Sequence, residues 1–159
     1  SSASPLMPSL QNQPGTLYLN YDAKDRTVYK HELGNKIVQD TKLDVLGRYR
    51  SISIIGHSAG GDVGIFAMEQ ADVTAQRKLA LLDPSMSTGD ILYEGMFAKL
   101  DDLVESGVNA LLLYGNSPPE YSNLALSTKA QTELLKADHF TYYQEPTVIE
   151  KVRNLLSEW

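Results

Sequence analysis

One stretch of the sequence, residues 51–68, constrains the fold more than any other. It opens with a short apolar run, Ile52 to Ile55, which is rich in β-branched residues and ends at Gly56, as expected of a buried strand. Small residues and an apolar stripe follow from Gly60 onward, and this pattern predicts a helix that packs closely against a sheet. A buried strand followed at once by a helix is typical of a parallel α/β sheet.

The turn between the two elements reads Gly-His-Ser-Ala-Gly and fits the pattern G-x-S-x-G. Such a turn lifts its central residue, Ser58, above the sheet edge in a strained backbone conformation. We expect a Cβ at Gly56 or Gly60 to collide with the neighbouring strand or helix, which would explain the spacing of the glycines. The free N–H groups of the helix N-terminus point toward the serine oxygen, where negative charge develops during acyl transfer. The alternative is that this segment is a glycine-rich turn without a catalytic role, in another kind of α/β protein.

Length, charge and composition exclude several classes of protein. A chain of 159 residues, with 42% hydrophobic and 21% charged residues, suits one globular domain. The net charge is −6 and the 14 basic residues are scattered, which argues against a nucleic-acid partner. No apolar run is long enough for a membrane span and no signal peptide is visible, so we expect a soluble protein, either cytoplasmic or secreted with its signal already removed.

Cysteine is absent, which excludes disulfides, thiolate metal ligands and cysteine nucleophiles. The three histidines, His31, His57 and His139, show no H-x-x-x-H spacing. We therefore expect no metal and no cofactor.

The rest of the sequence alternates between predicted strands and helices. Residues 1–15 hold three prolines and predict an extended or disordered arm, and residues 16–159 predict one domain. Besides the strand before Gly56, strands are expected at Thr16–Tyr21, Lys78–Leu82, Val108–Tyr114 and Glu133–Leu135. Helices are expected over most of His31–Arg48, and at Gly89–Glu105, Ser122–Lys129 and Thr147–Trp159, although Thr27–Leu33 could instead extend as a hairpin arm. This order predicts a single three-layer α/β domain, with a mostly parallel sheet of about five strands and helices on both faces.

Residues able to do chemistry fall in the loops that follow these strands. Ser58, Asp83, Glu120 and His139 all lie there. Because open α/β sheets carry their sites at the carboxyl ends of the strands, we expect these side chains to gather at one edge.

These residues resemble those of a small α/β-hydrolase of the serine esterase or lipase type. The resemblance rests on Gly56-His57-Ser58-Ala59-Gly60-Gly61, on Leu82-Asp83-Pro84, and on Asp138-His139-Phe140 ahead of a terminal helix. The order serine, acid, histidine is the one this fold uses. The resemblance implies that Ser58 is the nucleophile, that His139 is general base and then general acid, and that the Ala59 backbone N–H is one oxyanion donor. His57 and Tyr121 would lie near the substrate.

The acid of the triad is open between two loops. In most of this family the acid follows the strand equivalent to Val108–Tyr114, where this chain offers only Glu120. Asp83 instead resembles the alternative position of pancreatic-type lipases, although an Asp-Pro pair also commonly just ends a strand. Asp62 and Asp138 are lesser candidates, and we prefer Asp83.

The amino end departs from the family, which makes the chain look trimmed there. If Thr16–Tyr21 is the strand before the oxyanion loop, Asn20 or Tyr21 supplies the second N–H donor. If it is instead the next strand of the family, this chain lacks that loop. Losing one donor costs about 10²–10³ in rate.

The function expected from this resemblance is hydrolysis of a small carboxylic ester or thioester through an acyl-enzyme on Ser58. No lid-sized insertion is visible, so we expect an accessible esterase site. The alternative is a catalytically weak or inactive module that serves binding or assembly, and a peptidase or acyltransferase could use the same triad. The sequence leaves the oligomeric state open.

Overall fold

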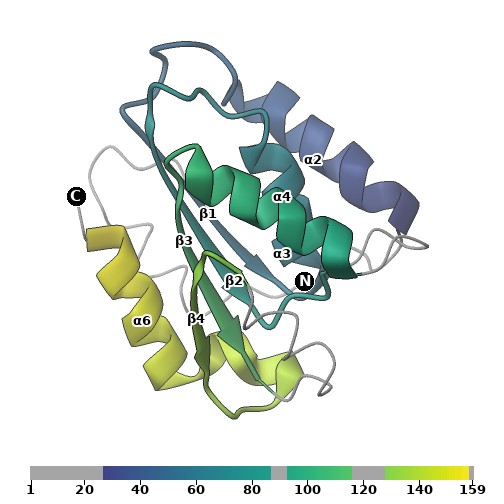
Figure 1. Ribbon diagram of the computed structural model, residues 1–159, viewed down its shortest axis with the longest axis vertical. Helices are drawn as coiled ribbons and strands as arrows, with labels where there is room; N and C mark the ends of the chain where they lie inside the picture. Colours follow the sequence, from purple (N-terminus) through teal and green to yellow (C-terminus); the bar gives the residue numbers. More distant parts are fainter. Residues whose placement is uncertain (1–26, 87–92, 116–127, 158–159) are drawn as a thin grey trace.

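Three largely apolar runs and one short polar strand at the sheet edge form a parallel sheet at the centre of the molecule (Figure 1). The computed structural model describes residues 27–86, 93–115 and 128–157. Within them the strands are β1 (Ser51–His57), β2 (Gln76–Leu82), β3 (Asn109–Tyr114) and β4 (Gln131–Leu134). They lie in the order β1-β2-β3-β4, and every neighbouring pair is parallel.

Helices connect and cover these strands. They are α2 (Thr27–Thr41), α3 (Ala59–Met68), α4 (Tyr93–Glu105) and α6 (Pro146–Ser157), with a 3-10 helix, η1 (His139–Gln144), just before α6. Because the strand order runs in one direction from β1 to β3, right-handed crossovers place α3 and α4 on the same face. In Figure 1, α6 stands on the other side of the strands from α2, α3 and α4.

Side-chain alternation along β2 builds a separate apolar core on each face. Leu79 and Leu81 join the core beneath α2, α3 and α4, whereas Ala80 and Leu82 join the core beneath η1 and α6. All four residues are almost completely buried. The described residues thus form an α/β arrangement with helices on both faces of a parallel sheet.

Several predicted boundaries needed correction. The helix expected at His31–Arg48 begins earlier and ends at Thr41, because Lys42 takes a left-handed conformation with φ 59° that stops it. The structure also forms η1 at His139–Gln144, where we expected no regular element, and the terminal helix begins at Pro146, one residue before its predicted start.

The expected strand count of about five compares with four in the described sheet. The expected strand Thr16–Tyr21 and the arm at 1–15 lie outside the described residues, as does nearly all of the helix expected at Ser122–Lys129.

The glycines of the turn after β1 do not all play the part that we expected. A Cβ on Gly56 would lie 2.2 Å from the carbonyl oxygen of Gly60, so that position tolerates no side chain. A Cβ on Gly60 meets nothing within 4 Å, so the prediction for Gly60 is wrong. The second close approach belongs to Gly61, where a Cβ would lie 2.7 Å from the Cβ of Pro84. The sequence pattern therefore misassigned which glycine lets the helix lie close to its neighbours.

These contacts predict opposite effects for two alanine substitutions. Gly56→Ala should lower the free energy of unfolding by about 2–3 kcal/mol or more, because a backbone atom must move. Gly60→Ala should leave it unchanged or raise it by up to about 1 kcal/mol, because alanine is the better helix former. Urea unfolding of both variants measures this difference. Equal destabilisation by the two substitutions would contradict the packing described for this turn.

Candidate active site

Ser58 is the residue at the tip of the turn between β1 and α3. Its backbone angles, φ 56° and ψ −125°, are uncommon for a residue with a side chain and store strain of about 1–3 kcal/mol. Its N–H donates to the carbonyl oxygen of Leu82 at 3.0 Å, which fixes the turn against β2. The hydroxyl does not cap the helix that follows. The Ser58 hydroxyl is thus held at the sheet edge and remains available to another partner.

That partner is the ring of His139, at the start of η1. Nε2 of His139 lies 2.9 Å from the Ser58 oxygen. The preceding residue, Asp138, caps η1 by accepting a hydrogen bond from the Phe140 N–H at 2.8 Å, which sets the direction of the backbone at His139. Residues 81 apart in the sequence are thereby brought into one hydrogen bond.

Asp83 contacts the other nitrogen of the same ring. Its Oδ2 lies 2.5 Å from Nδ1 of His139, and its Oδ1 accepts a hydrogen bond from the Gly115 N–H at 2.8 Å. The Asp83 side chain is almost buried, whereas His139 remains about one-third exposed. The hydroxyl, the imidazole and the carboxylate therefore form one continuous chain of hydrogen bonds.

The remaining acid candidates have other positions. Asp62 is buried and accepts hydrogen bonds from Lys30, Ser85 and the Met86 N–H. Asp138 caps η1. Glu120 lies outside the described residues. Among the described carboxylates, Asp83 is the one that the structure brings to the ring of His139.

Comparisons with family models, with curated protein sequences and with solved structures give no match for this chain. The interpretation of the site therefore depends on its geometry and on the chemistry of its residues.

His57, which we expected near the substrate, lies beside His139. Its Nε2 is 2.6 Å from the backbone carbonyl oxygen of His139, and its ring is 5.1 Å from the rings of both His139 and Tyr143. A carbonyl oxygen can only accept a hydrogen bond, so Nε2 of His57 carries a hydrogen atom and is the donor. Burial lowers the pKa of His57 from its ordinary value, which favours the neutral ring. His57 thus supports the backbone that carries His139.

The candidate oxyanion donors are described only in part. Ala59 is the first residue of α3, and a helix leaves its first N–H groups without partners inside the helix. The other candidates, Asn20 and Tyr21, lie outside the described residues, as does Tyr121. The described residues hold no group of three or more histidine, cysteine, aspartate or glutamate side chains that could bind a metal, and no described helix could cross a membrane.

Two supports of the site were not found from the sequence. The Gly115 N–H holds Asp83, and a Cβ on Gly115 would lie 2.9 Å from the carbonyl oxygen of Ala137 and 3.1 Å from Oδ2 of Asp83. The buried Tyr142 hydroxyl donates to the carbonyl oxygen of Tyr114 at 2.7 Å, which ties η1 to the end of β3. Burial, and secondarily the charge of Asp83, raises the pKa of Tyr114 and of Tyr142 above its ordinary value, which further favours the neutral hydroxyls. In the sequence, the only sign of these two supports was a glycine, Gly115, directly after β3.

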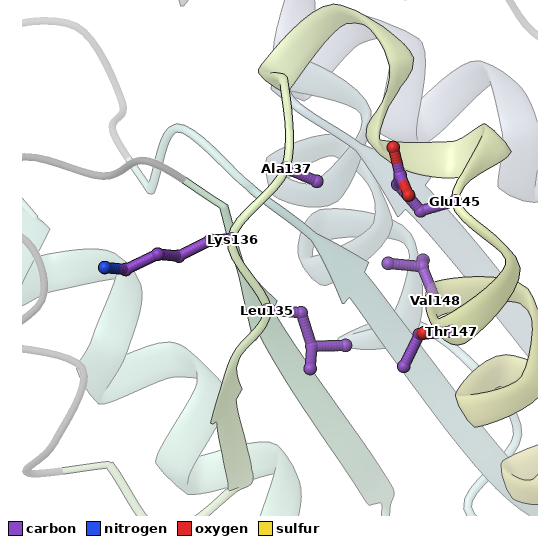
Figure 2. A pocket seen from close by; sticks show the side chains of 6 residues that line it. All are labelled: Leu135, Lys136, Ala137, Glu145, Thr147 and Val148. Carbon is purple, nitrogen blue, oxygen red and sulfur yellow. The ribbon is translucent and has the colours of Figure 1, made fainter.

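A pocket of about 140 Å³ lies between the segment after β4 and the start of α6, and contains none of the three hydrogen-bonded side chains (Figure 2). Its lining residues are Leu135, Lys136, Ala137, Glu145, Thr147 and Val148. Figure 2 shows the Lys136 side chain pointing away from the others. This pocket is therefore a surface hollow next to the second core, separate from the site around Ser58.

The lowered pKa of His57 predicts a pH dependence of stability. The unfolded chain, with an ordinary histidine pKa near 6.5, takes up the proton before the folded protein does. The stabilisation by neutral His57 is therefore complete above a pH of about 6.5. It is lost as the pH falls from there toward the lower pKa that His57 has in the folded protein. His57→Gln, which keeps an N–H donor, should lose less stability than the wild type between pH 7.5 and pH 5.5. Urea unfolding at the two values tests this, and an equal loss in both proteins would contradict it.

Proposed function

We propose that this protein is a serine hydrolase that cleaves a carboxylic ester or thioester through an acyl-enzyme on Ser58. One observation carries the proposal: Ser58, His139 and Asp83 form a hydrogen-bonded chain with distances of 2.9 and 2.5 Å, in the arrangement that activates a serine hydroxyl. The strained backbone of Ser58 supports it, because such strain is typical of functional sites.

In the proposed reaction, the Ser58 oxygen attacks the carbonyl carbon while Nε2 of His139 takes the hydroxyl proton. Asp83 accepts the hydrogen bond from Nδ1, which keeps the ring in the tautomer that can take this proton and stabilises the imidazolium. The N–H of Ala59, at the positive end of α3, stabilises the oxyanion. His139 then returns the proton to the leaving alcohol or thiol, and water repeats the steps to release the acid.

The arrangement of the elements supports a place in the α/β-hydrolase fold. The nucleophile follows β1, the acid follows the neighbouring strand β2, and the histidine follows β4, the last strand of the described sheet. The acid would then occupy the lipase-like position that precedes the usual one by a strand.

One exposed aromatic side chain favours apolar ester substrates. Phe140 is 79% exposed, and its ring lies 5.3 Å from the ring of His139 in an edge-to-face contact. Because His139 protonates the leaving group, an apolar surface beside it suits an ester with an apolar alcohol.

Two carboxylate substitutions test the proposal. The wild type should hydrolyse a short p-nitrophenyl ester, and Asp83→Asn should lower kcat by about 10³–10⁴, because the amide selects the wrong histidine tautomer. Glu120→Gln, the matched control in the other candidate loop, should lower kcat by less than about tenfold. Steady-state kinetics of the three proteins gives the answer. Absence of any turnover by folded wild-type protein would contradict the proposed function. A larger loss of kcat in Glu120→Gln than in Asp83→Asn would contradict the assignment of Asp83 as the acid.

A further inference from the structure

A buried charged cluster joins α2, α3 and the turn after β2. The carboxylate of Asp62 on α3 is completely buried, and its Oδ2 lies 2.7 Å from Nζ of Lys30 on α2. Ser85 donates to the same oxygen at 2.7 Å, and the Met86 N–H donates to Oδ1 at 2.7 Å. Lys30, itself 2% exposed, also donates to the Ser85 hydroxyl at 3.1 Å. Three separate segments of the chain thus meet at one carboxylate.

Stability alone is a poor explanation for this cluster. Removing two charges from water is costly for each ion, and apolar residues of similar volume often stabilise such a position as well or better. A buried ion pair that is retained in a core can instead fix one arrangement of the groups around it. The groups that Asp62 fixes therefore indicate its role.

Those groups belong to the turn that carries Asp83. Ser85 and Met86 follow Asp83 by two and three residues, and Pro84 packs against Gly61 on α3. Asp83 and Met86 both have left-handed backbones, with φ 45° and 54°, which residues with side chains adopt only under constraint. The hydrogen bonds to Asp62 supply a constraint of this kind, since they attach the strained turn to a helix.

The same helix begins beside the proposed nucleophile. Asp62 follows Ser58 by four residues, so a single turn of α3 separates the serine from the carboxylate that anchors the acid loop. The distance between the nucleophile and the acid is thereby set through one rigid element.

We infer that Asp62, with its charge balanced by Lys30, is a positioning residue that holds the Asp83 carboxylate against His139. The inference rests on the proposed function for its effect on rate, although the hydrogen bond that it concerns exists without any substrate.

The test replaces the pair with apolar residues, in Lys30→Met/Asp62→Leu, so that no unpaired charge remains buried. Its matched control is Lys36→Met/Asp40→Leu, because Lys36 and Asp40 form an ion pair of the same 2.7 Å length on the exposed face of α2. A second variant, Ser85→Ala, removes one anchoring hydrogen bond and keeps the ion pair. Circular dichroism and thermal unfolding establish whether the double variant folds. If it does not fold, Ser85→Ala takes its place in the test.

The first readout needs no activity. A hydrogen-bonded imidazole N–H in slow exchange gives a low-field proton resonance, which Asp83→Asn and His139→Ala assign to the bond between Asp83 and His139. The resonance should be lost or broadened in the folded Lys30→Met/Asp62→Leu protein and retained in the control. If that variant is unfolded, the resonance of Ser85→Ala should broaden or shift instead.

The second readout is kinetic. Misplacement of Asp83 should lower kcat by about 10²-fold in the double variant and by about tenfold in Ser85→Ala, with KM nearly unchanged. In an Asp83→Asn background the same changes should cost almost nothing, because the acid that they position is already gone. If the Lys30–Asp62 pair had a purely structural role, the same changes would lower kcat by the same factor in the wild-type protein and in Asp83→Asn.

A folded double variant with a wild-type resonance and wild-type kcat would overturn the inference, as would a Ser85→Ala protein with both unchanged if only that variant folds. If the wild type shows no turnover while its resonance is present and depends on the pair, the proposed function fails and the positioning role stands.

Discussion

The register of the parallel sheet is the constraint on which the rest of the structure depends. His57, Leu82 and Leu113 lie side by side on β1, β2 and β3. The ladder continues one residue further, because the Ser58 N–H donates to Leu82 and the Asp83 N–H donates to Leu113. Ser58 and Asp83, the proposed nucleophile and acid, are therefore the next residues along two adjacent strands. A slip of one residue between β1 and β2 would direct every side chain of one strand to the wrong face, so the two apolar cores also fix the geometry of the site.

Strain at the sheet edge has to be balanced by contacts elsewhere. Ser58, Asp83 and Met86 all have positive φ, and each makes a backbone or side-chain hydrogen bond to a neighbouring element. The carboxylate of Asp83, which is nearly buried, obtains its partners from Gly115 and His139. Burial of polar groups is tolerated here because each has a partner of suitable geometry, and those partners restrict the side chains to one arrangement.

Local patterns predicted those features that depend on neighbouring residues in the sequence. The apolar runs indicated the strands, and α4 ends at Glu105 as expected, shortly before Gly107 takes a left-handed conformation with φ 104°. The G-x-S-x-G turn indicated Ser58, whereas Asp83 and His139 were indicated by their places after strands and by the family resemblance, and parallel pairing brings such positions to one edge. Features that depend on contacts between distant segments were missed: the role of Gly61 requires the position of Pro84, and the link from Lys30 to Asp62 joins residues 32 apart. The 3-10 helix after Asp138 depends on a cap by that residue, which the sequence indicated only as a lesser candidate for the acid.

The central claim is that Ser58 is an activated nucleophile. Its most direct test is the reaction of the folded protein with a fluorophosphonate probe, followed by intact mass and peptide mapping, with Ser58→Ala as the control. The account predicts rapid addition of one probe per chain at Ser58 and none in the variant. Folded wild-type protein that remains unlabelled, or labelling that persists in Ser58→Ala, would contradict it.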